Sequence, residues 1–130
     1  MEETVFATVG EDGSVRLFDT RELRNSNIIY ETTNPKVGLT HVKWNLREKN
    51  MMAVVAENDT KVLLFDKRKP NYIVETLNHD SKVNAIAWSP AQANMICSVV
   101  EGVNNCGNAL IWDLYDNNNG ESPIDQQNLD

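Results

Sequence analysis

A short sequence pattern recurs three times at a constant interval, and this repeat restricts the fold more than any other feature of the chain. Each copy contains an apolar run, a turn and a second apolar run that ends in an aromatic residue followed by aspartate. The copies end at Phe18-Asp19, Phe65-Asp66 and Trp112-Asp113, so that both steps between the aspartates are 47 residues. A period of this length indicates a repeat architecture, in which each unit buries its apolar surface only by stacking on its neighbours.

Short apolar runs alternate with turn residues within each copy and predict β-strands, whereas no long stretch shows helical periodicity. In the first copy, Asp12-Gly13 lies between two such runs. This dipeptide predicts a two-residue hairpin turn, because glycine readily adopts the positive φ that such a turn needs. The predicted strands are Val5–Val9, Val15–Phe18, Asn27–Thr33, Leu39–Trp44, Met51–Ala56, Lys61–Phe65, Tyr72–Leu77, Val83–Trp88, Met95–Val100 and Ala109–Trp112, with a weak one near Pro123-Ile124.

Four strands per copy is the unit of a β-propeller blade. Runs that are apolar on both faces, such as Val62–Phe65, fit a sheet stacked between two others. We expect an all-β partial β-propeller with one complete blade at residues 34–78, flanked by incomplete ones at 1–33 and 79–115, and a flexible acidic, Asn-rich tail at 116–130. A closed propeller takes at least about four blades, so this chain is not expected to close by itself.

Composition excludes several classes of function. A net charge of −7 argues against nucleic-acid binding, which needs clustered Lys and Arg. The two cysteines, Cys97 and Cys106, show neither a disulfide framework nor zinc spacing, and His41 and His79 have no partner at metal spacing. We expect no metal, no cofactor, no membrane segment and a cytoplasmic or nuclear location, because no signal peptide or spanning run of about 18 residues is present.

The aromatic–aspartate strand ends resemble the signature of WD-repeat β-propellers. The third copy is also similar to the family pattern of histidine, two spaced aliphatic residues, an aromatic residue and Ser-Pro; the residues concerned are His79, Val83, Ile86, Trp88 and Ser89-Pro90. At a finer level the chain resembles the plant transparent-testa-glabra regulators and the animal cullin-ligase-associated, kinase-binding WD-repeat scaffolds. Such proteins are thought to have seven blades, so the resemblance implies a segment of a seven-bladed propeller.

The resemblance implies a non-catalytic scaffold that assembles kinase or transcription-regulator complexes. The alternative is a substrate receptor of a cullin ubiquitin ligase. In families with this pattern, an arginine two positions after the terminal aspartate is associated with docking to the ligase adaptor, and Arg21 and Arg68 are the candidates here. Arginine suits docking because its planar fork pairs with carboxylates. The structural alternative is that each arginine folds back onto Asp19 or Asp66.

The resemblance also implies structural roles at Asp12, Asp19, Asp66, His79, Trp88, Ser98, Trp112 and Asp113. The family often links His, Ser or Thr, Asp and Trp within a blade. His79, Ser98 and Trp112 can supply three of these, but the loop 101–108 displaces the aspartate, so we expect no complete tetrad. Ser98 with His79 suggests a catalytic triad, yet nothing encodes an oxyanion hole or a nucleophile elbow, so we expect no enzyme.

Two further expectations concern surfaces. Trp44 and Trp88 occupy matching strand positions and are expected to fill the core. The loop 101–108 is a candidate recognition loop, with tolerated surface variation as the alternative. The open faces and strand edges of the terminal blades are expected to make the isolated chain self-associate.

Overall fold

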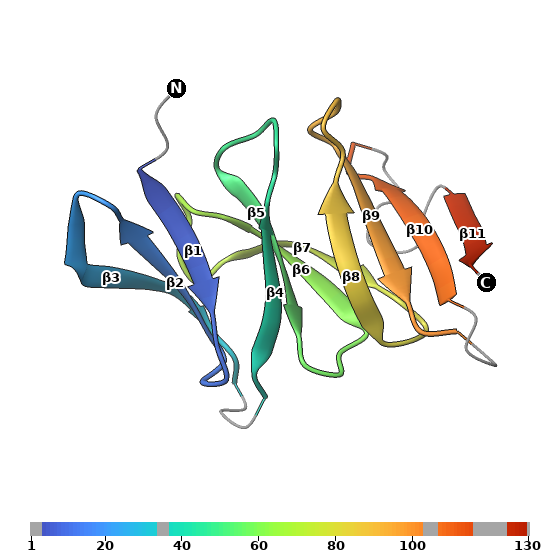
Figure 1. The fold of residues 1–130 in the computed structure, drawn as a ribbon, viewed down its shortest axis with the longest axis horizontal. Coiled ribbons are helices and arrows are strands. Elements are labelled where there is room, and N and C mark those ends of the chain that lie inside the picture. Colours follow the sequence, from blue (N-terminus) through green and yellow to red (C-terminus); the bar gives the residue numbers. More distant parts are fainter. Residues whose placement is uncertain (1–3, 34–36, 103–106, 116–124, 130) are drawn as a thin grey trace.

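The chain forms three antiparallel β-sheets that stand side by side (Figure 1). This computed structural model describes residues 4–33, 37–102, 107–115 and 125–129, and no helix that could span a membrane occurs in this part. The strands of the first sheet are β1 (Val5–Val9), β2 (Ser14–Asp19) and β3 (Glu22–Glu31). Those of the second are β4 (Leu39–Trp44), β5 (Met51–Ala56), β6 (Lys61–Asp66) and β7 (Ile73–Asn78). Those of the third are β8 (Val83–Trp88), β9 (Met95–Val100), β10 (Gly107–Asp113) and β11 (Asp125–Leu129).

Each sheet is a meander in which strands consecutive in sequence are also neighbours in space. The strands β1, β4 and β8 line one face of the molecule, with β4 in contact with both of the others (Figure 1). The outer strands β3, β7 and β11 lie at the opposite edges of their sheets. This is the arrangement of neighbouring propeller blades, and it confirms the predicted fold class.

The core is divided between the two junctions of the stack. One apolar cluster fills the space between the first and second sheets, and a second cluster fills the space between the second and third. Alternate residues of β5 serve the two clusters, since Met52 and Val54 belong to the first and Ala53 and Val55 to the second. The middle sheet is therefore buried on both faces, as its apolar runs predict.

The observed strand bounds agree with the predicted ones where the strand is apolar on both faces or alternates between apolar and polar residues. β4, β5, β8 and β9 have the predicted ends. β3 differs, because it begins at Glu22 rather than Asn27 and ends at Glu31 rather than Thr33. Its first half is mostly exposed and, apart from Leu23, polar, so backbone pairing with β2 extends the strand where no hydrophobic pattern marks it.

The strand β11 corrects the prediction that the third blade is incomplete and is followed by a flexible tail over 116–130. This strand pairs with β10 in a regular antiparallel register from Ile111↔Asp125 to Gly107↔Leu129, so the third sheet has four strands. Its sequence has no apolar alternation, and a strand can add to an edge through backbone hydrogen bonds alone. The weak strand expected near Pro123-Ile124 thus lies just after that dipeptide, and residues 116–124 and 130 fall outside the described residues.

The predicted two-residue turn between β1 and β2 is wrong in length but right about glycine. Four residues connect the strands, and the Gly13 N–H donates to the Gly10 carbonyl at 3.0 Å. Gly13 has a φ of +76°, and a Cβ there would clash with Thr32 Oγ1. The turn is completed by Asp12, whose carboxylate accepts from the backbone N–H and hydroxyl of Ser14.

Candidate functional site

The two Asp-x-Arg turns have the same geometry. Arg21 Nε and Nη2 donate to the two carboxylate oxygens of Asp19 at 3.0 and 2.6 Å, and its backbone N–H donates at 2.9 Å. Arg68 makes the same three bonds to Asp66 at the same distances. The arginines therefore fold back onto the aspartates, as the structural alternative predicts.

The aspartates and arginines of these turns differ in exposure. The Asp66 side chain is 7% exposed, whereas that of Arg68 is 62% exposed and that of Arg21 is 74% exposed. Hydrogen bonds from the arginine side chain and backbone lower the pKa of Asp19 to about 2, and the Arg68 side chain lowers the pKa of Asp66. Each turn thus fixes a guanidinium group in place by two of its five N–H donors and leaves it facing solvent.

The third copy keeps the turn without the arginine. Asp113 accepts the backbone N–H of Tyr115 at 3.0 Å, and Asn94 Nδ2 donates to the same oxygen at 2.7 Å. These bonds lower the pKa of Asp113, that from Asn94 most strongly. Among the described turns, only the first two therefore present a guanidinium group.

His79, Ser98 and Trp112 form the hydrogen-bonded chain that the family resemblance implies. Trp112 Nε1 donates to Ser98 Oγ at 3.0 Å, and Ser98 Oγ lies 2.7 Å from His79 Nε2. His79 Nδ1 lies 3.1 Å from the carbonyl oxygens of both Thr60 and Leu77, so Nδ1 carries the proton and Nε2 accepts from the serine hydroxyl. Two backbone carbonyls, that of Thr60 just before β6 and that of Leu77 in β7, thus hold the His79 ring.

Ser98 does not have the surroundings of a nucleophile. Its side chain is fully buried, and its oxygen is already occupied by His79 and Trp112. Burial lowers the pKa of His79, which keeps the imidazole neutral as this hydrogen-bonded chain requires. The three residues link the end of β7 in the second sheet to β9 and β10 in the third.

The remaining candidate residues have local partners. The Asp12 carboxylate accepts from Arg16 at 3.4 Å as well as from Ser14, and His41 Nδ1 lies 2.9 Å from Thr40 Oγ1. Within the described residues, no group of three or more His, Cys, Asp or Glu side chains could hold a metal ion. Of the 101–108 loop, residues 103–106 lie outside the described residues, so its recognition role stays a prediction.

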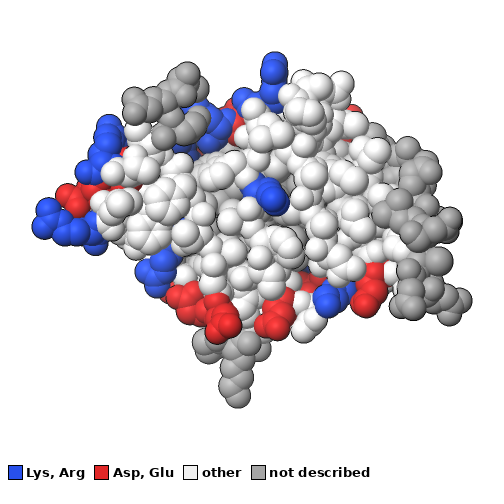
Figure 2. Space-filling view, in the orientation of Figure 1, with Lys and Arg blue, Asp and Glu red and all other residues white. Residues whose placement is uncertain are grey.

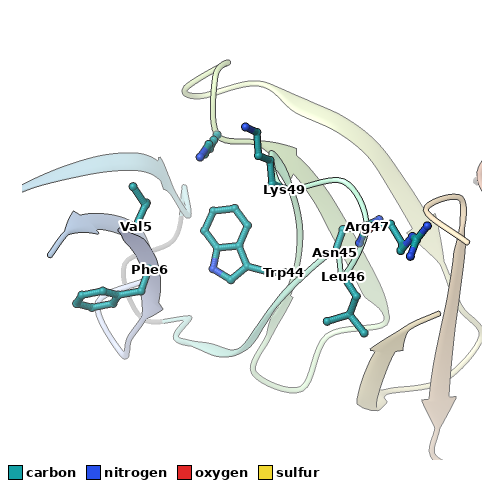
Figure 3. A pocket seen from close by; sticks show the side chains of 8 residues that line it. Val5, Phe6, Trp44, Asn45, Leu46, Arg47 and Lys49 are labelled. Carbon is teal, nitrogen blue, oxygen red and sulfur yellow. The ribbon is translucent and has the colours of Figure 1, made fainter. Parts of the chain in front are cut away.

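A groove of about 400 Å³ lies between the first and second sheets, beside β1 and the loop that joins β4 to β5. Figure 3 shows the indole of Trp44 between Phe6 on one side and the 45–49 loop on the other. The lining residues are Val5, Phe6, Trp44, Asn45, Leu46, Arg47, Lys49 and Lys67. Figure 2 shows acidic side chains gathered along the lower edge of this face, away from the β4–β5 loop at its upper edge.

This groove was not predicted, because the matching positions of Trp44 and Trp88 predicted that both fill the core. Trp88 is buried as expected, with 5% of its surface exposed, but Trp44 is only partly buried. Lys67 Nζ lies 6.0 Å from the centroid of the Trp44 ring, so a cation lies over the exposed indole. The available signal was the charged segment Arg47–Lys49, which has no counterpart after Trp88.

Known proteins that are similar to this chain include WD-repeat proteins, in agreement with the repeat pattern. The family model described as eukaryotic translation initiation factor eIF2A matches residues 7–126. The chain is 41% identical over 111 residues to a DDB1- and CUL4-associated factor 7 homolog of Dictyostelium discoideum, covering 85% of this chain and 33% of that protein. It is 32% identical over 130 residues to the WD repeat-containing protein YPL247C of Saccharomyces cerevisiae, covering 85% and 24% respectively.

Two more distant matches extend this picture. The GATOR2 complex protein WDR59 of Homo sapiens is 26% identical over 98 residues, which covers 75% of this chain and 10% of that protein. A computationally designed protein, Ika8, superposes with a TM-score of 0.68 at 16% identity, covering 98% of this chain and 34% of its own, and supports the fold alone. The chain spans about a third or less of the length of these relatives.

Proposed function

The chain belongs to the WD-repeat β-propeller family, and on that premise we propose that it serves as a protein-interaction scaffold without catalytic activity of its own. The observation that carries the proposal is the pair of identical Asp–Arg turns, which present fixed, exposed guanidinium groups at equivalent positions of neighbouring sheets. Rigid elements that present charged turns suit protein docking. The buried Ser98 is consistent with a non-catalytic role.

We propose that the bound proteins are kinases or transcription regulators. The support is the resemblance of the repeat pattern to kinase-binding WD-repeat scaffolds. Cross-linking mass spectrometry on the tagged chain in cell extract tests this. The expected result is a particle in which one copy of the chain is cross-linked to two different proteins, one of them a kinase or a transcription regulator. Cross-links only between copies of the chain would contradict the proposal.

A second candidate function is that of a cullin-ligase substrate receptor. The specific observation in its favour is that Arg21 and Arg68 share one geometry, and a relative at 41% identity is named for association with DDB1 and CUL4. Replacing both arginines by alanine should reduce recovery of DDB1 in a pull-down several-fold. Arg24→Ala is the matched control, because Arg24 is an exposed arginine of the same strand region that is paired with Glu22. Equal recovery by the double variant and the control would rule out docking through these turns.

A further inference from the structure

The outer edge of the second sheet exposes an apolar patch made of Tyr72, Ile73 and Val74. These three residues are consecutive, and between 37% and 55% of each is exposed to solvent. The second sheet packs against another sheet on each of its two faces, so the patch belongs to the rim of the stack. The Asn71 N–H donates to the Ile29 carbonyl of β3 at 2.6 Å, which fixes the start of the patch to the first sheet.

The other two outer strands have a different composition. Edge strands of natural proteins usually carry charged or polar side chains, because an exposed apolar edge pairs with other chains. In β3, the exposed Leu23 lies between Glu22 and Arg24, which form an ion pair. The sequence of β11 is polar apart from Leu129. Three consecutive exposed apolar residues at the edge formed by β7 therefore indicate a surface that another chain covers.

The backbone of β7 can bond to such a chain. The His79 N–H donates to the Thr60 carbonyl at 2.9 Å, and residues of an antiparallel pair alternate between bonding to the partner strand and pointing away from it. The N–H and C=O groups of Thr76 therefore point away from β6, and no strand lies beyond β7 in the described second sheet. The register shift beside Val74 limits further pairing to a few residues, so side-chain contacts must supply the rest of the binding.

The charges along this edge indicate the chemistry of the bound chain. The turn before β7 contains three cations in a row, Lys67–Lys69, and residues 67–74 include no Asp or Glu. Lys69 Nζ lies 5.7 Å from the centroid of the Tyr72 ring, so a cation borders the apolar patch. Glu75 follows the patch. The edge is thus basic at its start, apolar in the middle and acidic after the patch.

We propose that the outer edge of β7 binds an extended segment of a partner protein, antiparallel to β7 like the strands of this sheet. The segment bonds to the Thr76 backbone, packs an apolar side chain on Tyr72 and Val74, and directs carboxylates toward Lys69. Its acidic residues are C-terminal, because an antiparallel segment places that end beside the turn 67–69 and away from Glu75. This names the partner chemistry of the proposed scaffold and rests on that function.

The experiment uses the purified full chain, labelled with 15N, and two synthetic peptides blocked at both ends. The acidic probe is Thr-Val-Thr-Val-Thr-Asp-Glu-Asp, and the neutral probe has Asn-Gln-Asn in place of its last three residues. At saturation with either probe, the Thr76 amide signal should shift and its exchange with solvent should slow. The acidic probe should bind about fivefold more tightly, and added salt should remove that preference.

Two pairs of variants separate the apolar contact from the charge. Val74→Ser should weaken the binding of both probes about fivefold, whereas Leu23→Ser, at an exposed apolar residue of β3, should leave it unchanged. Lys69→Gln should abolish the preference for the acidic probe, and Lys61→Gln, at the other end of the sheet, should preserve it. The Trp88 indole N–H donates to the Lys43 carbonyl at 3.0 Å, and its signal shows whether each variant is folded.

Four results would overturn the proposal. The first two are a Thr76 amide whose exchange the acidic probe does not slow, and equal affinity for the two probes. The third is slowed exchange that appears with rising protein concentration and no probe, because the occupant is then a second copy. The fourth is binding to phosphatidylserine vesicles without binding of either peptide, because the patch then contacts a membrane. The cross-linking and pull-down experiments test the scaffold function separately, so that function can hold when this proposal fails.

Discussion

At the scale of single residues, Ser98 joins two aromatic rings through one hydroxyl group. Its hydroxyl accepts from the buried Trp112 ring and donates to the partly buried His79 ring, and both bonds cross between strands or sheets. The sequence pattern identified His79, Ser98 and Trp112 as partners, because the family pattern fixes their spacing. The pattern did not predict where the Arg21 side chain points. Folding back onto Asp19 and pointing outward differ only by rotation of side-chain torsions.

Ser98→Ala should lower the free energy of unfolding by about 1–3 kcal/mol, because it leaves the buried Trp112 N–H and the partly buried His79 Nε2 without their partner. Urea unfolding followed by Trp fluorescence measures the change. Cys97→Ser is the matched control, because Cys97 is the next residue and faces the opposite side of β9, where about 0.5 kcal/mol or less is expected. Equal effects of the two substitutions would show that the hydrogen-bonded chain adds nothing to stability.

Asp19 should titrate with a pKa of about 2, well below its ordinary 3.8. The ion pair with Arg21 therefore favours the folded state fully above about pH 4, and this contribution is lost as the pH falls toward 2. Carboxyl 13C chemical shifts of Asp19 measure the titration. Arg21→Ala should move the pKa back toward 3.8, whereas Arg24→Ala should leave it in place. A carboxyl that titrates alike in all three proteins would mean that the pair is not populated in solution.

At the scale of elements, the strands with an apolar pattern could be predicted from the sequence. The strand segments that are held only by backbone pairing could not. β4, β5, β8 and β9 are bounded by their apolar residues, so their ends could be predicted. β11 and the first half of β3 are held by pairing with β10 and β2 at sheet edges, where side-chain pattern carries no information. Likewise, the groove lies between two sheets, so no single copy of the repeat reveals it.

Gly13→Ala should destabilise the chain by more than about 1 kcal/mol, because the turn requires a positive φ and the added Cβ would clash with Thr32 and the Val37 carbonyl. Thermal unfolding by circular dichroism measures the effect. Gly10→Ala in the same turn is the control, since a Cβ there meets only Asp12 Oδ1, at an ordinary 3.4 Å. A turn that tolerates both substitutions equally would contradict the assigned geometry.

At the scale of the whole molecule, the three sheets form a row with one inner and two outer members. The face of the third sheet that points away from the second is apolar and only partly buried, with a hollow of about 270 Å³. Its apolar lining residues include Ala87, Met95, Cys97 and Ile111. Burial of this face requires another surface of similar character.

The isolated chain should therefore associate with itself, and its mean mass in light scattering after size exclusion should rise with concentration. Ile111→Lys should reduce the association, because it places a charge in the centre of the apolar face. Val74→Lys is the control, since Val74 is an exposed apolar residue of the outer strand β7. A single monomeric mass over a hundredfold range of concentration would contradict the prediction.

β4 carries both halves of a junction. Its last residue, Trp44, carries an indole N–H at the register position of Trp88, and the residue just ahead, Lys43, accepts from the Trp88 indole of the next sheet. Because one segment carries both the donor and the matching acceptor, the acceptor of one copy can meet the donor of the next when the segment is duplicated in tandem. The gene for such a chain can therefore grow by copying a single unit, and each new copy needs no compensating change before selection alters its loops. The uncharged loop after Trp88 and the basic loop after Trp44 are an example of divergence on such a conserved joint.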